Sequence, residues 1–170
     1  ANPGRTARRA AGSYYTPPGL VVLLANQVRR AKRIVDPACG AGHLLLALLR
    51  IGVPAESLHG IDNDPIAVAL TQWVLALETG REPEEFSARI RCADALRAWP
   101  TGWMPFDGII GNPPFVNAIE GGVSEKTKAA LRAHFPEIGG TGDLSFYFVA
   151  QAARHLAPGG VMAFILPRTF

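Results

Sequence analysis

Residues 33–51 set an apolar segment, a glycine-containing turn and a second apolar segment in immediate succession. The first segment, RIVDPA at 33–38, has the length of a buried strand that ends at Asp36. The second, from His43 to Ile51, has the length of a helix. A strand, a glycine turn and a helix open a mononucleotide-binding unit, so this segment predicts an α/β fold.

The turn itself, CGAG, contains Gly40 and Gly42, which let the backbone approach a ligand closely. The helix that follows offers free N–H groups in its first turn. Leu45 stands where the third glycine of the dinucleotide fingerprint would fall, and this departure argues against a dehydrogenase. Taken alone, the two-glycine turn fits simple packing as well as ligand binding.

Strand and helix patterns alternate through the rest of the chain. Thr16 can cap the first helix, whose apolar stripe is Leu20, Leu23, Leu24 and Val28. Further strands are expected at 57–61, 88–92, 106–110 and 161–166, and further helices from Asp64 to Leu77, Glu125 to Phe135 and Leu144 to Leu156. Asp143 can cap the last of these helices, and APGG at 157–160 ends it before the strand at 161–166. The 170 residues, 48% of them hydrophobic, fit one domain with one sizeable core. We expect a Rossmann-like, mostly parallel, doubly wound sheet that is truncated after its fifth strand.

Charge and cysteine content bound the class of protein. The chain has 17 basic and 14 acidic residues, and the basic clusters at 5–9 and 29–33 permit contact with a polyanion or serve as solvated faces. Cys39 and Cys92 form no CxxC pair, which predicts neither a disulfide framework nor a metal site and favours a cytoplasmic protein. No apolar run reaches the roughly 20 residues that span a membrane, and no apolar signal core precedes Tyr14.

Acidic residues follow the second and third predicted strands. Asp62 stands at the tip of the second strand. Its spacing from Gly42 along the sequence suits a carboxylate that binds both ribose hydroxyls. Asp64 and Pro65 have the pattern of a helix cap and first turn, so Asp62 is the better ribose ligand. Asp94, after the third strand, can accept a hydrogen bond from a purine amine or act as an ordinary turn residue.

The stretch 106–115, FDGIIGNPPF, ends an apolar strand with an amide, two prolines and an aromatic ring. Pro113 and Pro114 fix φ, lack an N–H group and push Asn112 towards an extended conformation. The side-chain oxygen of Asn112 and the Pro113 carbonyl can accept two hydrogen bonds from one amine, while Phe115 stacks on a flat partner. A Pro-Pro turn with an Asn cap is the alternative explanation of these residues.

Four motifs stand in order along the chain, YYTPP, DPACGAG, GIDNDP and FDGIIGNPPF, and APGGVMAFILP follows them. Together they resemble the catalytic domain of the S-adenosylmethionine-dependent amino-methyltransferases, most of all the adenine-specific DNA methyltransferases of restriction-modification systems. The resemblance covers nearly all of residues 12–170. The ordered set is specific, although each motif alone is only moderately so. The position of TPP before DPACGAG is similar to the subclass in which a target-recognition domain comes last.

The resemblance implies S-adenosyl-L-methionine as the cofactor. It implies these cofactor-binding residues: Tyr14, Thr16, Pro17, Asp36, Ala38, Gly40, Asp62 and Asp94. The YYTPP residues would border the amino-acid end, the DPACGAG residues would flank the methionine moiety, and the last two aspartates would bind the ribose hydroxyls and the adenine amine. Considered locally, Tyr14 and Tyr15 are better explained by packing of the helix that follows.

The resemblance also implies that the target base is held by Asn112, Pro113, Pro114 and Phe115. An exocyclic amine is a poor nucleophile because its lone pair is delocalised into the ring, and two fixed acceptors would favour a pyramidal nitrogen. Ala41 departs from the serine often found in the family, and no catalytic role is implied for His43.

The implied activity is methyl transfer to the exocyclic amine of adenine in double-stranded DNA, with the base flipped out of the duplex. The alternative is methylation of a glutamine side-chain amide in a protein such as a release factor, because those enzymes also use NPP plus an aromatic residue. A non-catalytic nucleotide-binding scaffold is a third interpretation.

We expect residues 1–13 to be a flexible basic N-terminus and 14–170 to be the catalytic domain. The C-terminal strands and a target-recognition domain are expected to be absent from this chain, and the parent protein could also have a downstream nuclease. This fragment alone is therefore expected to be weakly active or inactive.

Overall fold

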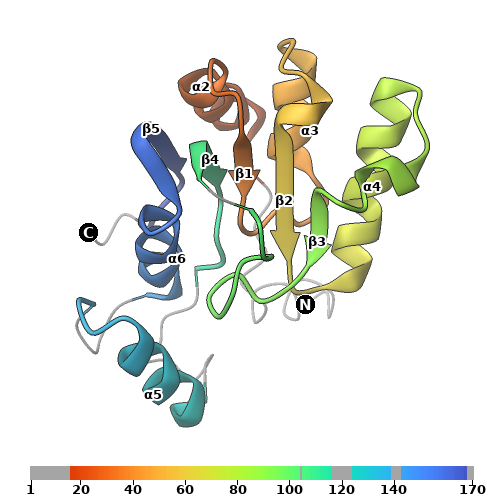
Figure 1. The fold of residues 1–170 in the computed structure, drawn as a ribbon. Coiled ribbons are helices and arrows are strands. Elements are labelled where there is room, and N and C mark those ends of the chain that lie inside the picture. Colours follow the sequence, from red (N-terminus) through yellow and green to blue (C-terminus); the bar gives the residue numbers. More distant parts are fainter. Residues whose placement is uncertain (1–15, 104, 116–123, 139–142, 168–170) are drawn as a thin grey trace, which may run out of the picture.

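The computed structural model describes residues 16–103, 105–115, 124–138 and 143–167. Five strands and five α-helices make up this part of the chain (Figure 1). The α-helices are α2 (Pro18–Val28), α3 (His43–Arg50), α4 (Pro65–Thr79), α5 (Glu125–His134) and α6 (Leu144–Ala153). The strands are β1 (Ile34–Asp36), β2 (Leu58–Asp62), β3 (Ile90–Cys92), β4 (Phe106–Gly111) and β5 (Leu156–Phe164), and two short 3-10 helices are η1 (Ala55–Ser57) and η2 (Pro83–Phe86).

The five strands form one parallel sheet in the order β3-β2-β1-β4-β5. The order reverses at β1, whose neighbours are β2 on one side and β4 on the other. Ligands of open α/β sheets bind outside the carboxyl ends of the strands at such a switch point. The expected parallel α/β fold is therefore confirmed, and β1 and β4 are the strands whose ends define the site.

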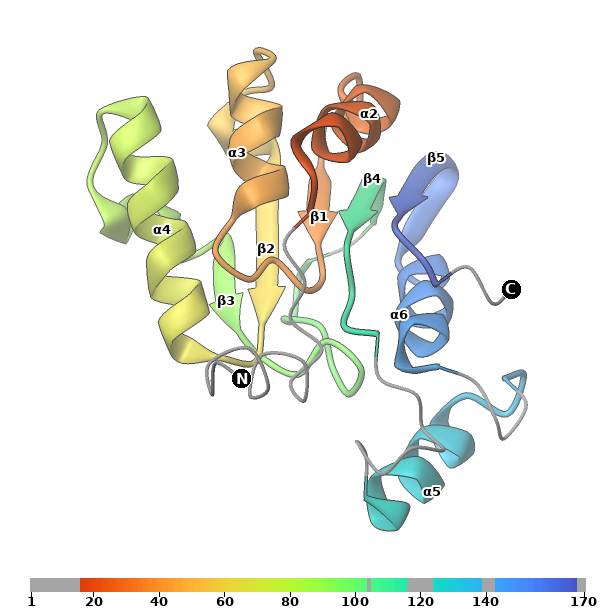
Figure 2. The same ribbon diagram turned by 180° about the vertical axis from the view of Figure 1, so that it is seen from behind.

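Helices cover both faces of the sheet, and the alternation of side chains along each strand explains why. Ile34 and Ile110 belong to one hydrophobic cluster with α2, α3 and α4, while Val35 and Ile109 belong to a second cluster with α5 and α6. Figure 2 shows α2, α3 and α4 together in front of the sheet. Because both faces are covered, apolar residues of the central strands, such as Val35 and Ile110, are buried on both sides of the sheet.

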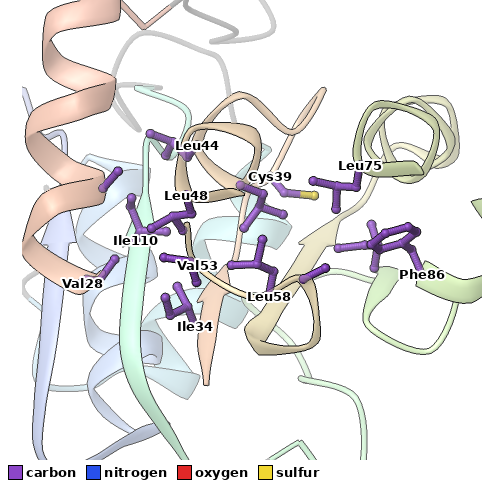
Figure 3. Close-up of a cluster of buried hydrophobic side chains, with 14 of the residues drawn as sticks. Val28, Ile34, Cys39, Leu44, Leu48, Val53, Leu58, Leu75, Phe86 and Ile110 are labelled. Carbon is purple, nitrogen blue, oxygen red and sulfur yellow. The ribbon is translucent and has the colours of Figure 1, made fainter. Parts of the chain in front are cut away.

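The first cluster fills the space between the sheet and helices α2 to α4 (Figure 3). Leu45, Leu48 and Leu58 are completely buried in it. Burying one such side chain contributes roughly 1.5–3 kcal/mol. This cluster fixes α3 against β1 and β2, so the turn between β1 and α3 has a rigid support on both sides.

Helix α6 and strand β5 differ from the expected boundaries. The helix predicted to reach Leu156 ends at Ala153, and β5 begins at Leu156 instead of Val161. Leu156 pairs with Phe106 and Val161 pairs with Gly108, so β5 accommodates additional residues opposite a short piece of β4. The APGG sequence, predicted as a turn between two elements, is therefore an irregularity inside an edge strand.

The start of α2 also differs from the prediction. The N-cap residue is Pro17, with no side-chain capping hydrogen bond, so Thr16 is not the cap. Within the predicted apolar stripe, Leu24 and Val28 are buried, whereas Leu20 and Leu23 are 41% and 55% exposed. The stripe is wider than the surface that α2 buries against α3 and the sheet.

The caps predicted for the later helices are confirmed. Asp64 accepts a hydrogen bond from Ile66 N at 2.9 Å at the start of α4. Asp143 accepts one from Ser145 N at 2.9 Å at the start of α6.

Candidate cofactor and amine site

Three predicted site residues stand at the carboxyl ends of neighbouring strands. Asp36 is the last residue of β1, Asp62 is the last residue of β2, and Asn112 directly follows β4. Because the strands are parallel and adjacent, these ends meet at one edge of the sheet. The structure thus brings together the residues that the sequence placed at three separate strand tips.

The glycine turn after β1 is tied to its neighbours by side-chain hydrogen bonds. Asp62 accepts one from the backbone N of Gly40 at 2.8 Å and a second from the backbone N of Asp64 at 3.0 Å. On the opposite side of the turn, the hydroxyl of Thr71 on α4 donates to the carbonyl oxygen of Gly40 at 2.7 Å. Both backbone groups of Gly40 are therefore held, one by β2 and one by α4.

The two glycines of the turn are required by conformation. Gly40 and Gly42 have φ values of +52° and +80°, which a side chain rarely adopts. A Cβ on Gly42 would also lie 3.1 Å from the side chain of Thr71, whereas none of the described residues beyond the chain neighbours has an atom within 4 Å of the corresponding position on Gly40. As far as the described residues go, the backbone at Gly40 therefore leaves room for a ligand.

Asp36 is buried beneath this turn. Its carboxylate accepts a hydrogen bond from Ala38 N at 3.0 Å, and only 2% of the residue is exposed. The pKa of Asp36 is raised to about 7, mainly by burial; the bond from Ala38 N opposes the rise, and the nearby Asp62 carboxylate adds to it. Burial likewise raises the pKa of the Cys39 thiol. A positive group of a bound ligand would restore the charged form of Asp36.

The side-chain amide of Asn112 has a donor group that is bonded and an oxygen that is not. Nδ2 donates to the hydroxyl of Thr16 at 2.8 Å. Oδ1 is buried, and within the described ranges of the chain no group donates to it. Pro113 is buried, and Pro114 and Phe115 are half-buried. A buried acceptor without a donor costs about 1–3 kcal/mol, so it indicates a ligand site when it lies at a strand end.

Asp94 follows β3 at the same edge of the sheet, where the preceding Ala93 N donates to the carbonyl oxygen of Asp62 at 2.9 Å. One carboxylate oxygen of Asp94 accepts a hydrogen bond from Leu96 N at 3.0 Å, and the other pairs with Arg97 at 3.1 Å. These contacts are those of a turn residue, which the local sequence favoured. Its implied contact with a purine amine remains a prediction, and so do the ligand roles of the other site residues. Tyr14 lies outside the described residues.

Two features of the site were not predicted from the sequence: the contact of Thr71 with Gly40, and the hydrogen bond between Thr16 and Asn112. Thr71 lies in the middle of α4 and its role depends on a contact with Gly40 that no local pattern reveals. A polar residue at a fully buried helix position is the signal that could have drawn attention to it. The bond between Thr16 and Asn112 joins positions 96 residues apart, so the sequence could place each near the site without linking them.

No helix in the described segments is long and apolar enough to cross a membrane. The same residues contain no group of three or more His, Cys, Asp or Glu side chains that could hold a metal ion.

Similar proteins of known sequence carry several methyltransferase names. The chain is 27% identical over 99% of its length to a type II methyltransferase of Thermus thermophilus. It is 29% identical over 82% of its length to a release factor glutamine methyltransferase of Geobacter sulfurreducens, and 28% identical over 88% to a ribosomal RNA small subunit methyltransferase of Shewanella pealeana. The chain spans 37%, 48% and 36% of these relatives' own lengths.

Solved structures with the same fold are methyltransferases too. The methyltransferase subunit of a type I restriction-modification system from Streptococcus thermophilus has a TM-score of 0.66 at 23% identity, over 91% of this chain and 34% of that one. A methyltransferase from Thiobacillus denitrificans, solved with S-adenosyl-L-homocysteine, has a TM-score of 0.56 at 14% identity, over 97% and 58%. The fold is that of S-adenosylmethionine-dependent methyltransferases such as the one from Thiobacillus denitrificans. Within that class the chain belongs to the N-6 DNA methylase family, which matches residues 3–170.

Proposed function

We propose that this chain is the catalytic part of an enzyme that methylates the exocyclic amine of adenine in double-stranded DNA. The observation that carries the proposal is the buried Oδ1 of Asn112, which lacks a donor among the described residues. An amine of a substrate supplies such a donor and offsets the cost of the buried oxygen. Membership of the N-6 DNA methylase family favours adenine as the source of that amine.

The residues at the ends of β1 and β2 fit the proposed cofactor. A carboxylate offers about four lone-pair sites, so Asp62 can still accept ribose hydroxyls after its bonds to Gly40 N and Asp64 N. The open space beside Gly40 admits a ligand against the turn. We propose that Tyr14, Pro17, Asp36, Ala38 and Asp94 complete the cofactor site, and that Thr16 stands at its border beside Asn112.

S-adenosyl-L-methionine supplies an electrophilic methyl group on a positively charged sulfur when it is bound. Asn112 Oδ1 and the carbonyl of Pro113 accept the two N–H groups of the amine, which directs its lone pair towards that methyl group. The N–C bond forms as the C–S bond breaks, and the amine then releases one proton to water. No strong base is needed before attack, because fixed acceptors supply most of the acceleration.

The aromatic ring after the two prolines serves the base itself. An adenine flipped from the duplex presents a flat face on which Phe115 stacks, a contact worth about 1–3 kcal/mol per base. Pro113 and Pro114 restrict the backbone between this ring and Asn112, so the acceptors and the stacking surface keep a constant spacing.

A glutamine side-chain amide is the second candidate substrate. Its nitrogen also has two N–H groups and a delocalised lone pair, so the same two acceptors would serve. The relative from Geobacter sulfurreducens, whose name states glutamine methylation, is 29% identical over 147 residues and favours this candidate. A planar base uses the Phe115 ring more fully than an amide does, and we therefore place DNA first.

The chain spans less than half of the length of the three sequence relatives described above. We therefore propose that residues 14–170 bind the cofactor and carry out catalysis. Further strands and a target-recognition domain of the parent protein then bind DNA. The isolated chain is then weakly active or inactive. Action on chromosomal DNA places the parent protein in the cytoplasm, and a nuclease downstream would complete a restriction-modification enzyme.

The parent protein, incubated with methyl-labelled cofactor and either DNA or release factors, tests the proposal. We expect label in DNA as N6-methyladenine, and an at least hundredfold loss of rate in Asn112→Ala. Asn26→Ala is the matched control, because Asn26 is exposed on α2 and bonds only its own helix, at Val22 O. Label in release factors alone would establish the amide substrate, and an Asn112→Ala protein with the parent rate would contradict the role of the amide.

A further inference from the structure

The hydroxyl of Thr16 is 2.8 Å from Nδ2 of Asn112 and joins the segment before α2 to the end of β4. The sequence resemblance implies that Thr16 borders the cofactor, and its local pattern suggests a helix cap. The structure shows no cap by Thr16, since the N-cap residue of α2 is Pro17. Instead, the only side-chain hydrogen bond it gives for the Asn112 amide, among the described residues, is the one to Thr16.

The orientation of the Asn112 amide decides whether the site can bind an amine. With Nδ2 towards Thr16, Oδ1 remains as an acceptor for an N–H group of the substrate. With the amide rotated by 180°, Oδ1 would bond the hydroxyl, and Nδ2 would direct its own N–H groups at those of the substrate. A threonine hydroxyl can donate or accept, so it must act as an acceptor to favour the productive orientation.

We propose that Thr16 is a positioning residue: its Oγ1 accepts a hydrogen bond from Asn112 Nδ2 and so holds Oδ1 ready to accept the N–H of the substrate amine. This inference rests on the proposed role of Asn112 as an acceptor. Thr16 acts through Asn112 and does not itself touch the amine.

The surroundings keep Thr16 in place. Pro17 and Pro18 follow it directly and fix the backbone at the start of α2. Leu24 and Val28 anchor that helix in the hydrophobic core. Threonine is branched at Cβ, which restricts its χ1 angle and keeps Oγ1 directed at its partner. The hydrogen bond therefore connects the side-chain amide of Asn112, which can rotate about its Cβ–Cγ bond, to a rigid support.

Thr16→Val retains the branched shape and removes the acceptor. We expect kcat of the parent protein to fall about tenfold, with KM for S-adenosylmethionine and for DNA within twofold of the parent values. Thr16→Ser restores the hydroxyl and should regain most of the lost kcat. Thr79→Val is the matched control with unchanged kcat, because within the described part of the chain the Thr79 hydroxyl bonds only the backbone of α4, at Leu75 O and Ala76 O.

Side-chain amide spectra of the ¹⁵N-labelled protein provide a readout that needs neither cofactor nor substrate. The Asn112 NH₂ signals, assigned with Asn112→Ala, should exchange slowly with solvent in the parent and in Thr16→Ser, and rapidly in Thr16→Val. Should Thr16→Val fail to fold, the parent and Thr16→Ser spectra still decide whether the amide is held.

Two results would overturn the inference. One is a Thr16→Val protein with the parent kcat or with only a raised KM for S-adenosylmethionine, which would make Thr16 a cofactor contact. The other is rapid exchange of the Asn112 NH₂ group in the parent.

Failure of the proposed function can be distinguished from failure of this inference. A parent protein that methylates glutamine but not DNA would refute only the proposed DNA substrate, and the kcat comparison would then use the amide substrate. If it methylated neither, the proposed function would fail while the spectra still showed whether Thr16 fixes the amide.

Discussion

Asp62, at the end of β2, accepts a hydrogen bond from the backbone N of Gly40 at 2.8 Å, so the second strand holds the turn that follows the first. The same carboxylate accepts a hydrogen bond from the N of Asp64, where α4 begins. One side chain therefore fixes the relative positions of a strand end, a glycine turn and a helix start. The cofactor site that we propose is assembled by this carboxylate before any ligand arrives.

Replacement of Asp62 by alanine should weaken cofactor binding far more than it weakens the fold. The change removes the ribose acceptor and leaves Gly40 N without its partner, so we expect the Kd for S-adenosylmethionine to rise at least tenfold. Isothermal titration of the parent protein and the variant measures the effect. An unchanged Kd would show that Asp62 organises the turn without touching the cofactor.

Asp64, two residues away, is the matched control with the opposite outcome. Its carboxylate caps α4 by accepting a hydrogen bond from Ile66 N, and it faces solvent. Asp64→Ala should cost about 1 kcal/mol of stability in urea unfolding, as the loss of a helix cap does. The Kd for S-adenosylmethionine should stay within twofold of the parent value, and a tenfold rise would show that the two aspartates share the ligand role.

The buried carboxyl of Asp36 should make stability fall as the pH rises from about 4 to 7. Its pKa is about 7 in the folded chain against an ordinary value of 3.8, because burial disfavours the charged form. Between these values the folded state keeps a proton that the unfolded state releases. The pKa difference corresponds to at most about 4 kcal/mol in the free energy of unfolding. This stabilisation is present below about pH 4 and is lost above about pH 7.

Asp36→Asn isolates this contribution, since asparagine stays neutral and its Oδ1 can still accept from Ala38 N. We expect the variant to be more stable than the parent at pH 8 and equal to it near pH 4, as measured by denaturant unfolding across that range. A constant difference between the two proteins at every pH would contradict the raised pKa. Cofactor binding, by contrast, should weaken in the variant because a negative partner is lost.

Gly111 should not tolerate a side chain. A Cβ at this position would lie 2.7 Å from the ring of Phe164 on β5 and 3.7 Å from Asp36 Oδ1. Gly111→Ala should therefore cost about 1–3 kcal/mol and displace Asn112, the next residue, which lowers the methylation rate. Gly19→Ala on α2 is the control, because no described residue outside the local helix backbone has an atom within 4 Å of its Cβ position, and it should stabilise the helix by about 0.5–1 kcal/mol.

The sequence was sufficient for the parts of the fold that depend on local pattern. Gly40, Gly42 and Asp62 were placed correctly at the ends of β1 and β2 because glycine turns and strand-terminal acids have regular spacing. Asp64 and Asp143 were recognised as caps for the same reason.

The errors have a common physical origin in long-range contacts. APGG at 157–160 has a local turn composition, yet pairing with β4 draws it into β5 as an irregularity of the edge strand. Thr16 is a residue type that is favoured at helix N-caps, yet its hydroxyl accepts a hydrogen bond from Asn112, 96 residues away. A partner that is distant in sequence decided both cases, and local propensity cannot anticipate such a partner.

Arg154 joins the end of α6 to the end of α5. Its guanidinium donates to His134 O and Glu137 Oε1, each at 2.9 Å, and lies 4.4 Å from the centre of the Phe135 ring. Helix α5 lies beyond the carboxyl ends of the strands, on the side of the candidate site (Figure 1). Arg154 therefore links helix α6, which packs on the sheet, to helix α5 near the proposed substrate.

Arg154→Ala should loosen α5 while the rest of the fold stays intact. We expect the amide protons of α5 to exchange at least tenfold faster, with those of β1 and β4 unchanged, in hydrogen exchange measured by mass spectrometry. Arg154→Lys should recover little, because an ammonium cannot reach both oxygens and stack on Phe135 together. Arg97→Ala is the control, since Arg97 forms an exposed pair with Asp94 worth less than about 1 kcal/mol. Equal protection of α5 in Arg154→Ala and the parent would show that Leu131 and Phe135, both buried in the core, hold the helix without it.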